Sequence, residues 1–68
     1  MTDIEIKIDV ALEEISELED LKYRSQDLLI VLSGTADPRA EQVRDDILDI
    51  EGRIEDLLLR VEQLQKEL

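Results

Sequence analysis

The second half of the chain has the most regular pattern of apolar and polar residues. From residue 40 to residue 68 an apolar side chain recurs every three or four positions without a break. This spacing is a heptad repeat, in which the a and d positions form one apolar seam along a helix. The seam comprises Ala40, Val43, Ile47, Ile50, Ile54, Leu57, Val61, Leu64 and Leu68. The pattern predicts an amphipathic helix over residues 38–67.

The first half has a similar but less regular seam. Its apolar positions keep the same spacing from Ile4 to Leu18, but the next one follows after three residues where four are due. That step resembles the shortened heptad called a stammer, and residues 22–27 then carry almost no apolar side chain. The residues expected to face a core or interface here are Ile8, Ile15, Leu18, Leu21, Leu28, Leu29 and Leu32. We expect a helix over residues 3–32.

The first ten residues allow two interpretations. An isoleucine or valine at every second position from 4 to 10 is the pattern of a strand. Thr2 and Glu5, however, have the spacing of a capping box, in which each side chain satisfies the other residue's backbone N–H at a helix start. The apolar seam also continues toward Ile15. These features favour a helix, with a strand over residues 4–10 as the alternative.

Turn-forming residues occur at one place, which predicts a loop over residues 33–37. Gly34 tolerates the left-handed conformation that commonly ends a helix, so we expect it to end the first helix there. Asp37 can cap free backbone N–H groups, and Pro38 suits the first position of the next helix. The chain therefore reads as one domain, residues 1–68, made of two helices joined by a short loop.

Two long helices with a short connection favour an antiparallel hairpin. The alternative is a parallel homodimer through the second helix, but it would place Asp46 opposite Glu51 of the partner helix, and like charges repel. A hairpin would instead bring Lys22 and Arg24 near the acidic residues within 45–49. We therefore predict an all-α fold, a two-helix antiparallel hairpin with coiled-coil-like packing.

One hairpin leaves apolar residues without a partner. Residues 28–32, LLIVL, encircle the first helix because successive helical residues lie about 100° apart. Gly52 has two interpretations: a tolerated exposed glycine or a point of close approach by another helix. The candidate partner surface comprises Ile30, Val31, Leu48, Gly52, Leu58 and Leu59. We expect two hairpins to form a homodimeric four-helix bundle, and a different protein on the same surface is the alternative.

Charge narrows the choice of partners. The chain has 8 Lys and Arg against 19 Asp and Glu, a net charge of −11. Nucleic-acid binding needs clustered basic residues, and here they are scattered, so we expect no direct binding to DNA, RNA or an anionic membrane. No apolar run approaches the roughly 20 residues of a membrane span, and the first residues lack the features of a signal peptide. We expect a cytoplasmic protein.

The sequence offers little material for catalysis. It contains no His and no Cys, which removes the usual zinc ligands and the commonest general base. We expect no enzymatic activity, no cofactor and no metal, and a regulatory or assembly role through protein–protein contacts. An alternative is that an acidic face imitates the phosphates of DNA and inhibits a nucleic-acid-binding protein. That candidate face comprises Glu13, Glu14, Glu17, Asp20, Asp45, Asp49 and Asp56.

Overall fold

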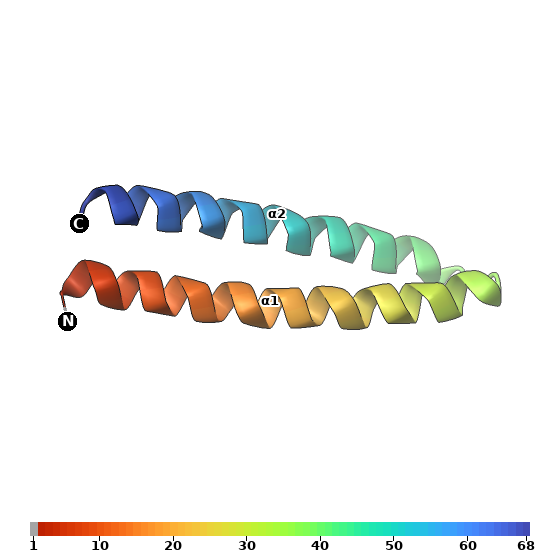
Figure 1. Ribbon diagram of the computed structural model, residues 1–68. Helices are drawn as coiled ribbons and strands as arrows, with labels where there is room; N and C mark the ends of the chain where they lie inside the picture. The colour runs from red at the N-terminus through yellow and green to blue at the C-terminus, as the bar shows by residue number, and fades with distance from the viewer. Residues whose placement is uncertain (1) are drawn as a thin grey trace.

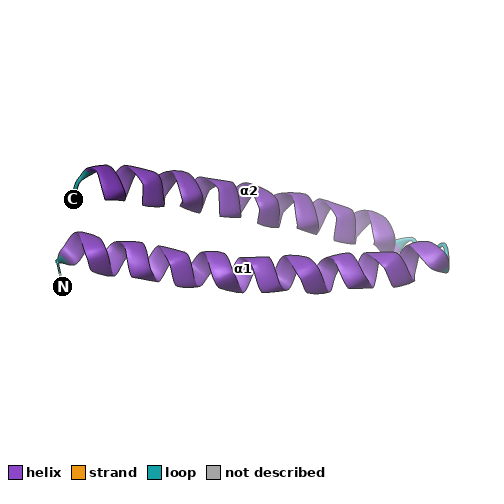
Figure 2. Cartoon of the chain, viewed as in Figure 1, coloured by secondary structure: helices purple, strands orange, loops and turns teal. Residues whose placement is uncertain are grey.

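Two long antiparallel helices account for nearly the whole chain (Figure 1). In the computed structural model, which describes residues 2–68, helix α1 spans Asp3–Gly34 and helix α2 spans Arg39–Lys66. The helices lie side by side, and the structure extends 50 × 15 × 10 Å between Cα positions. Residues 2–68 contain no strand (Figure 2). The predicted all-α helical hairpin is confirmed.

A capping box starts α1. The Thr2 hydroxyl accepts a hydrogen bond from the backbone N–H of Glu5, and the Glu5 carboxylate accepts one from the backbone N–H of Thr2, each at 3.2 Å. These bonds satisfy two donors that an uncapped helix would leave free. The strand alternative for residues 4–10 is therefore wrong, and the helical prediction is confirmed.

The turn is closed by Ala36, although Gly34 was expected to close it. Gly34 belongs to α1 and has no positive φ, whereas Ala36 has a φ of 55° in the left-handed region. The backbone N–H of Asp37 donates to the carbonyl of Leu32 at 3.0 Å, and that of Ala36 to Ser33 at 3.3 Å. This pair of bonds is a Schellman motif. The expectation for Gly34 was wrong because the helix continues two residues beyond 32.

Asp37 caps the start of α2, as its position before Pro38 predicted. Its carboxylate accepts a hydrogen bond from the backbone N–H of Arg39 at 2.9 Å, and its carbonyl accepts one from Ala40 at 3.1 Å. Pro38 already has helical angles, φ −62° and ψ −18°. The guanidinium of Arg39 also donates to the Asp37 carboxylate at 2.7 Å. The hydrogen bonds from Arg39 lower the pKa of Asp37 from its ordinary value of 3.8 to about 2, and the bond from the Arg39 side chain has the largest effect.

The buried side chains form two separate clusters. The open-end cluster, near the chain termini, comprises Ile8, Ala11, Ile15, Val61 and Leu64, with Ile4, Ile54 and Leu57 packed against it. The loop-end cluster comprises Leu32, Ala40, Val43 and Ile47, with Leu29 packed against it. Both clusters follow the predicted seam of α2, so one helix supplies a continuous stripe to two patches of α1.

A polar middle layer separates the two clusters. Lys22, Ser25 and Gln26 of α1 are half-buried between the helices at this level, where α2 contributes the buried Ile50. The inward positions of α1 thus keep the regular spacing through 18, 22, 25, 29 and 32, and the stammer expected after residue 18 is absent. Lys22 pairs with Glu51, at 3.7 Å between Nζ and Oε1, and not with the acids at 45–49.

Candidate interaction surface

The hairpin exposes much of its apolar content. Ten hydrophobic residues are buried among those described, while twelve large ones are exposed. The exposed set is Ile6, Val10, Leu12, Leu21, Tyr23, Leu28, Ile30, Val31, Leu48, Leu58, Leu59 and Leu68. Single exposed leucines are ordinary, but so many large apolar side chains exposed on so small a chain are candidates for contact with another protein.

The residues predicted to line a core or interface fall into three groups. Eight of them are buried: Ile8, Ile15, Leu32, Val43, Ile47, Ile50, Val61 and Leu64. Leu18, Leu29, Ile54 and Leu57 are half-buried. Leu21 and Leu28 are 47% and 48% exposed in a single chain, because the regular heptad of α1 turns them to one side of the seam. Their place in an interface between chains stays a prediction.

The residues predicted to contact a partner are all exposed. They are Ile30, Val31, Leu48, Gly52, Leu58 and Leu59, and Ile30 is the most open of them at 70%. A Cβ built on Gly52 would meet nothing within 4 Å, so no part of the hairpin itself needs a glycine there.

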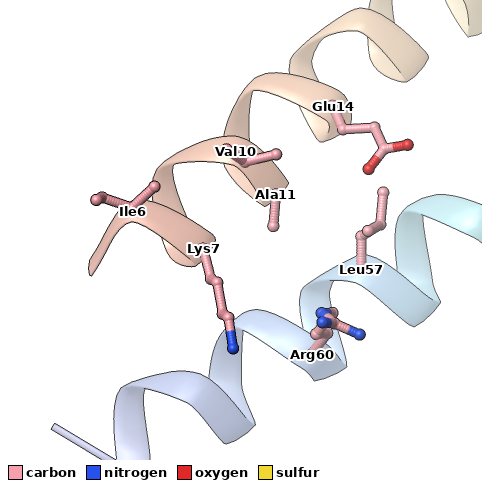
Figure 3. A pocket seen from close by; sticks show the side chains of 7 residues that line it. All are labelled: Ile6, Lys7, Val10, Ala11, Glu14, Leu57 and Arg60. Carbon is pink, nitrogen blue, oxygen red and sulfur yellow. The ribbon is translucent and has the colours of Figure 1, made fainter. Parts of the chain in front are cut away.

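Three grooves run along one broad side of the hairpin, between α1 and α2. The first is lined by Ile6, Lys7, Val10, Ala11, Glu14, Leu57 and Arg60. Figure 3 shows Ala11 of α1 and Leu57 of α2 both pointing into the space between the two helices, with Ile6 farther out on α1. The other two are lined by Leu18, Leu21, Ser25, Asp46, Asp49, Ile50, Arg53 and Asp56, together with Glu14 and Leu57. Shared lining residues place all three on the same side, which we call the groove face.

The groove face includes residues that the sequence analysis did not single out. Ile6 and Val10 belong to the segment for which a strand was the alternative, and both are exposed beside the first groove. Arg53 and Arg60 line the grooves from α2. The sequence does indicate this location for both arginines, because each occupies the heptad position directly beside the seam. Ser25 carried no such signal, since its inward position depends on the unbroken heptad of α1.

The seven residues of the candidate acidic face are exposed: Glu13, Glu14, Glu17, Asp20, Asp45, Asp49 and Asp56. Within residues 2–68 the ion pairs are Lys22 with Glu51 and Arg39 with Asp37. Most of the acidic side chains in this part of the chain therefore face solvent without forming a salt bridge.

Neither α1 nor α2, over residues 2–68, has a stretch long and apolar enough to span a membrane. In the same residues no three potential ligand side chains come together in a way that could hold a metal ion.

No family model, no curated protein and no solved structure matches the chain. The candidate features for binding a partner are the exposed apolar side chains and the groove face.

Proposed function

We propose that this protein works without catalysis, by binding other protein surfaces through its exposed apolar side chains, and that it first binds a second copy of itself. The product would be a four-helix bundle that serves as an assembly or regulatory module. The observation that carries the proposal is the large share of apolar residues left exposed by the hairpin.

The thinness of the core supports this proposal. Among the described residues, no large side chain is less than 2% exposed. A chain of 68 residues buries only about 60% of the surface of its unfolded state. Small domains without disulfides or metals commonly gain the missing stability by oligomerisation. A second helical layer on the hairpin would cover residues such as Leu21 and Leu28.

Charge on the groove face argues against phosphate mimicry there. A mimic of DNA needs an uninterrupted row of negative charge, whereas Arg53 and Arg60 alternate with Asp49 and Asp56 along α2. The two functions also respond differently to salt. Binding through acidic side chains weakens steeply as salt rises, while association through apolar side chains does not.

The test is the effect of two kinds of substitution on molar mass, measured by light scattering after size exclusion. Leu21→Asp and Leu28→Asp place a charge on exposed apolar positions of the groove face and should convert the dimer to a monomer. Glu13→Lys and Asp20→Lys, on the solvated side of α1, are the controls and should leave the dimer intact. Refractive index is the suitable detector because Tyr23 is the single aromatic residue.

The opposite pattern would overturn the proposal. If the lysine variants abolished partner binding and the aspartate variants changed nothing, the acidic surface would be the functional one.

A further inference from the structure

We infer that the groove face is covered by a second copy of this chain, related by a two-fold axis perpendicular to the helices, so that α1 packs on α1, α2 packs on α2, and the two loops lie at opposite ends. This inference rests on the proposed self-association and adds its surface, its direction and its register. Three features support this arrangement: a charge pattern in α2, an apolar pattern in α1, and the common level of the hairpin at which both patterns have their centres.

The α2 groove row is complementary to itself when it runs antiparallel. Five charged residues of α2 line the grooves, and residues three or four positions farther along the helix in both directions extend this set into a row. The row comprises Gln42, Asp46, Asp49, Arg53, Asp56, Arg60, Gln63 and Glu67. When the two-fold axis crosses this row between Arg53 and Asp56, Arg53 faces Asp56 of the second copy. In the same register Asp49 faces Arg60.

Each of these ion pairs occurs twice in a symmetric interface. Asp46 and Glu67 face glutamines, so no like charges oppose each other. Shifting the register by one heptad in either direction sets Asp46 against Asp56 or Asp49 against Glu67.

The α1 groove row brings apolar residues together in a matching register. It comprises Lys7, Val10, Glu14, Glu17, Leu21, Arg24, Leu28 and Val31. When the two-fold axis passes near residue 19, Val10 faces Leu28 of the second copy and Glu14 faces Arg24. In the same register Glu17 faces Leu21, and Lys7 faces Val31. The two Leu21 side chains lie about one helical turn apart across the axis. These contacts would cover Val10, Leu21 and Leu28, which are 57%, 47% and 48% exposed.

One axis serves both rows. Leu18 of α1 lines the same groove as Arg53 and Asp56 of α2, so the centre of the α1 row and the centre of the α2 row lie at one level of the hairpin. Two independent rows therefore favour the same symmetric arrangement. The broad side of the hairpin measures 50 by 15 Å between Cα positions, which is on the scale of the ~800 Å² that each partner buries in a stable complex.

The other symmetric packing of the groove face fits less well. With the loops at the same end, α1 would lie on α2 of the second copy, and Leu21 would face Arg53 while Leu28 faced Asp46. Glu14 would face Arg60 and Arg24 would face Asp49, which are attractive pairs. Glu17, however, would face Asp56, which is repulsive. Apolar residues opposite charged ones gain little from burial, and the buried charge loses hydration. The arrangement with loops at opposite ends also sets charges opposite Leu21 and Val31, but it brings Val10 against Leu28 and places no like charges opposite each other.

The test is a charge exchange between two chains. In homodimers, Arg53→Glu sets Glu against Asp56, and Asp56→Arg sets Arg against Arg53, so each variant alone should dimerise about tenfold more weakly or worse. Mixed together, the two variants form both attractive pairs again, and the heterodimer should regain nearly the affinity of the original chain. Because each variant keeps its own internal contacts in the mixture, recovery would come from contacts between chains. Sedimentation equilibrium at low salt measures all three affinities.

The matched controls carry the same charge changes off the groove face. Arg44→Glu and Glu55→Arg should leave self-association within about twofold, and mixing them should change nothing. If all groove-face variants dimerise as strongly as the original chain, or if mixing restores nothing, the inferred register is wrong while self-association stands. If the original chain is a monomer, both the inference and the proposed self-association fail.

A distance measurement tests the direction separately. The chain has no Cys, so Ser33→Cys gives one spin-label position on the exposed end of α1. Loops at opposite ends predict about 40 Å between the two labels, from a rise of 1.5 Å per residue on either side of the axis. Loops at the same end predict roughly 15–20 Å, because neighbouring helix axes lie 8–10 Å apart, and that result would overturn the inference.

Discussion

The two apolar clusters of the hairpin are built from the same residue types but are held differently. At the loop end, Leu32 and Ala40 are close in sequence, and the Schellman motif and the Asp37 cap fix the chain between them. At the open end, Ile8 packs in one cluster with Val61, and the whole hairpin lies between them. Closing a longer loop costs more entropy. Formation of the open end should therefore depend on the loop end more strongly than the loop end depends on the open end.

The middle layer sharpens this difference. Lys22, Ser25 and Gln26 interrupt the apolar contact between the two clusters, so packing is not continuous along the seam. Each cluster can then loosen with some independence. Substitutions at the two ends and in the middle layer should show how far the clusters differ and what connects them.

Removing a buried isoleucine from each cluster should have the largest effect. Ile15→Ala and Ile47→Ala should each lower the free energy of unfolding by about 2–4 kcal/mol, because Ile15 is 6% and Ile47 7% exposed. Hydrogen exchange should distinguish the two variants. Ile15→Ala should speed exchange mainly at the open end, whereas Ile47→Ala should speed it along both halves. Equal exchange profiles for the two variants would show that the hairpin opens as one unit.

Filling the middle layer should join the clusters. Ser25→Leu places an apolar side chain at a half-buried seam position and should raise the free energy of unfolding by about 1 kcal/mol. Ser16→Leu adds the same side chain at an exposed position of α1 and should change stability by less than about 0.5 kcal/mol. Chemical denaturation at one protein concentration measures both. A loss of stability in the Ser25 variant would mean that the serine hydroxyl, and not the missing side chain, matters at this level.

Exchanging alanine and glycine at the turn should stabilise the loop end in two places. Ala36→Gly relieves a left-handed alanine, and Gly34→Ala improves a helical position whose Cβ would meet nothing within 4 Å. Each should add about 0.5–1 kcal/mol to the free energy of unfolding. Thermal unfolding followed by circular dichroism measures the change. Destabilisation by Gly34→Ala would restore Gly34 as the residue that requires a positive φ.

The Asp37 cap should contribute a small pH dependence to the loop end. Its pKa is about 2 in the folded chain against an ordinary 3.8, chiefly because the Arg39 side chain donates to it. A lowered folded pKa means that the ionised form stabilises the fold above about pH 4, and this contribution is lost as the pH falls toward 2. The stability difference between the original chain and Asp37→Asn should therefore shrink over that range. NMR titration should show the pKa of Asp37 returning toward 3.8 in Arg39→Gln.

The fold could be predicted from the sequence because its signals are local. The seam of α2, the capping box at Thr2 and the Asp37 cap each depend on residues a few positions apart, and they predicted the helices. The short loop between the helices predicted their antiparallel pairing. The left-handed Ala36 could not be foreseen, because alanine gives no sign of that conformation and Gly34 offered an easier candidate.

The inward side of α1 was harder to predict for a physical reason. Leu21 and Leu28 suggested that the seam shifts, since burying leucine is favourable. In the structure the straight path of α1 against the regular α2 keeps Lys22 and Ser25 inward and leaves both leucines exposed. Whether a leucine is better buried in the hairpin or between two hairpins depends on a partner, and a single sequence does not specify the partner. The position of the α1 seam also determines the groove face, and no short sequence motif indicates that face.

The central claim is that the exposed apolar side chains of the hairpin are covered by a second copy of the chain. The most direct measurement is the molar mass of the unmodified protein by light scattering after size exclusion, at low and at high salt. We predict twice the mass of one chain under both conditions, because apolar burial carries most of the association. A folded protein with the mass of a single chain at both salt concentrations would contradict the claim.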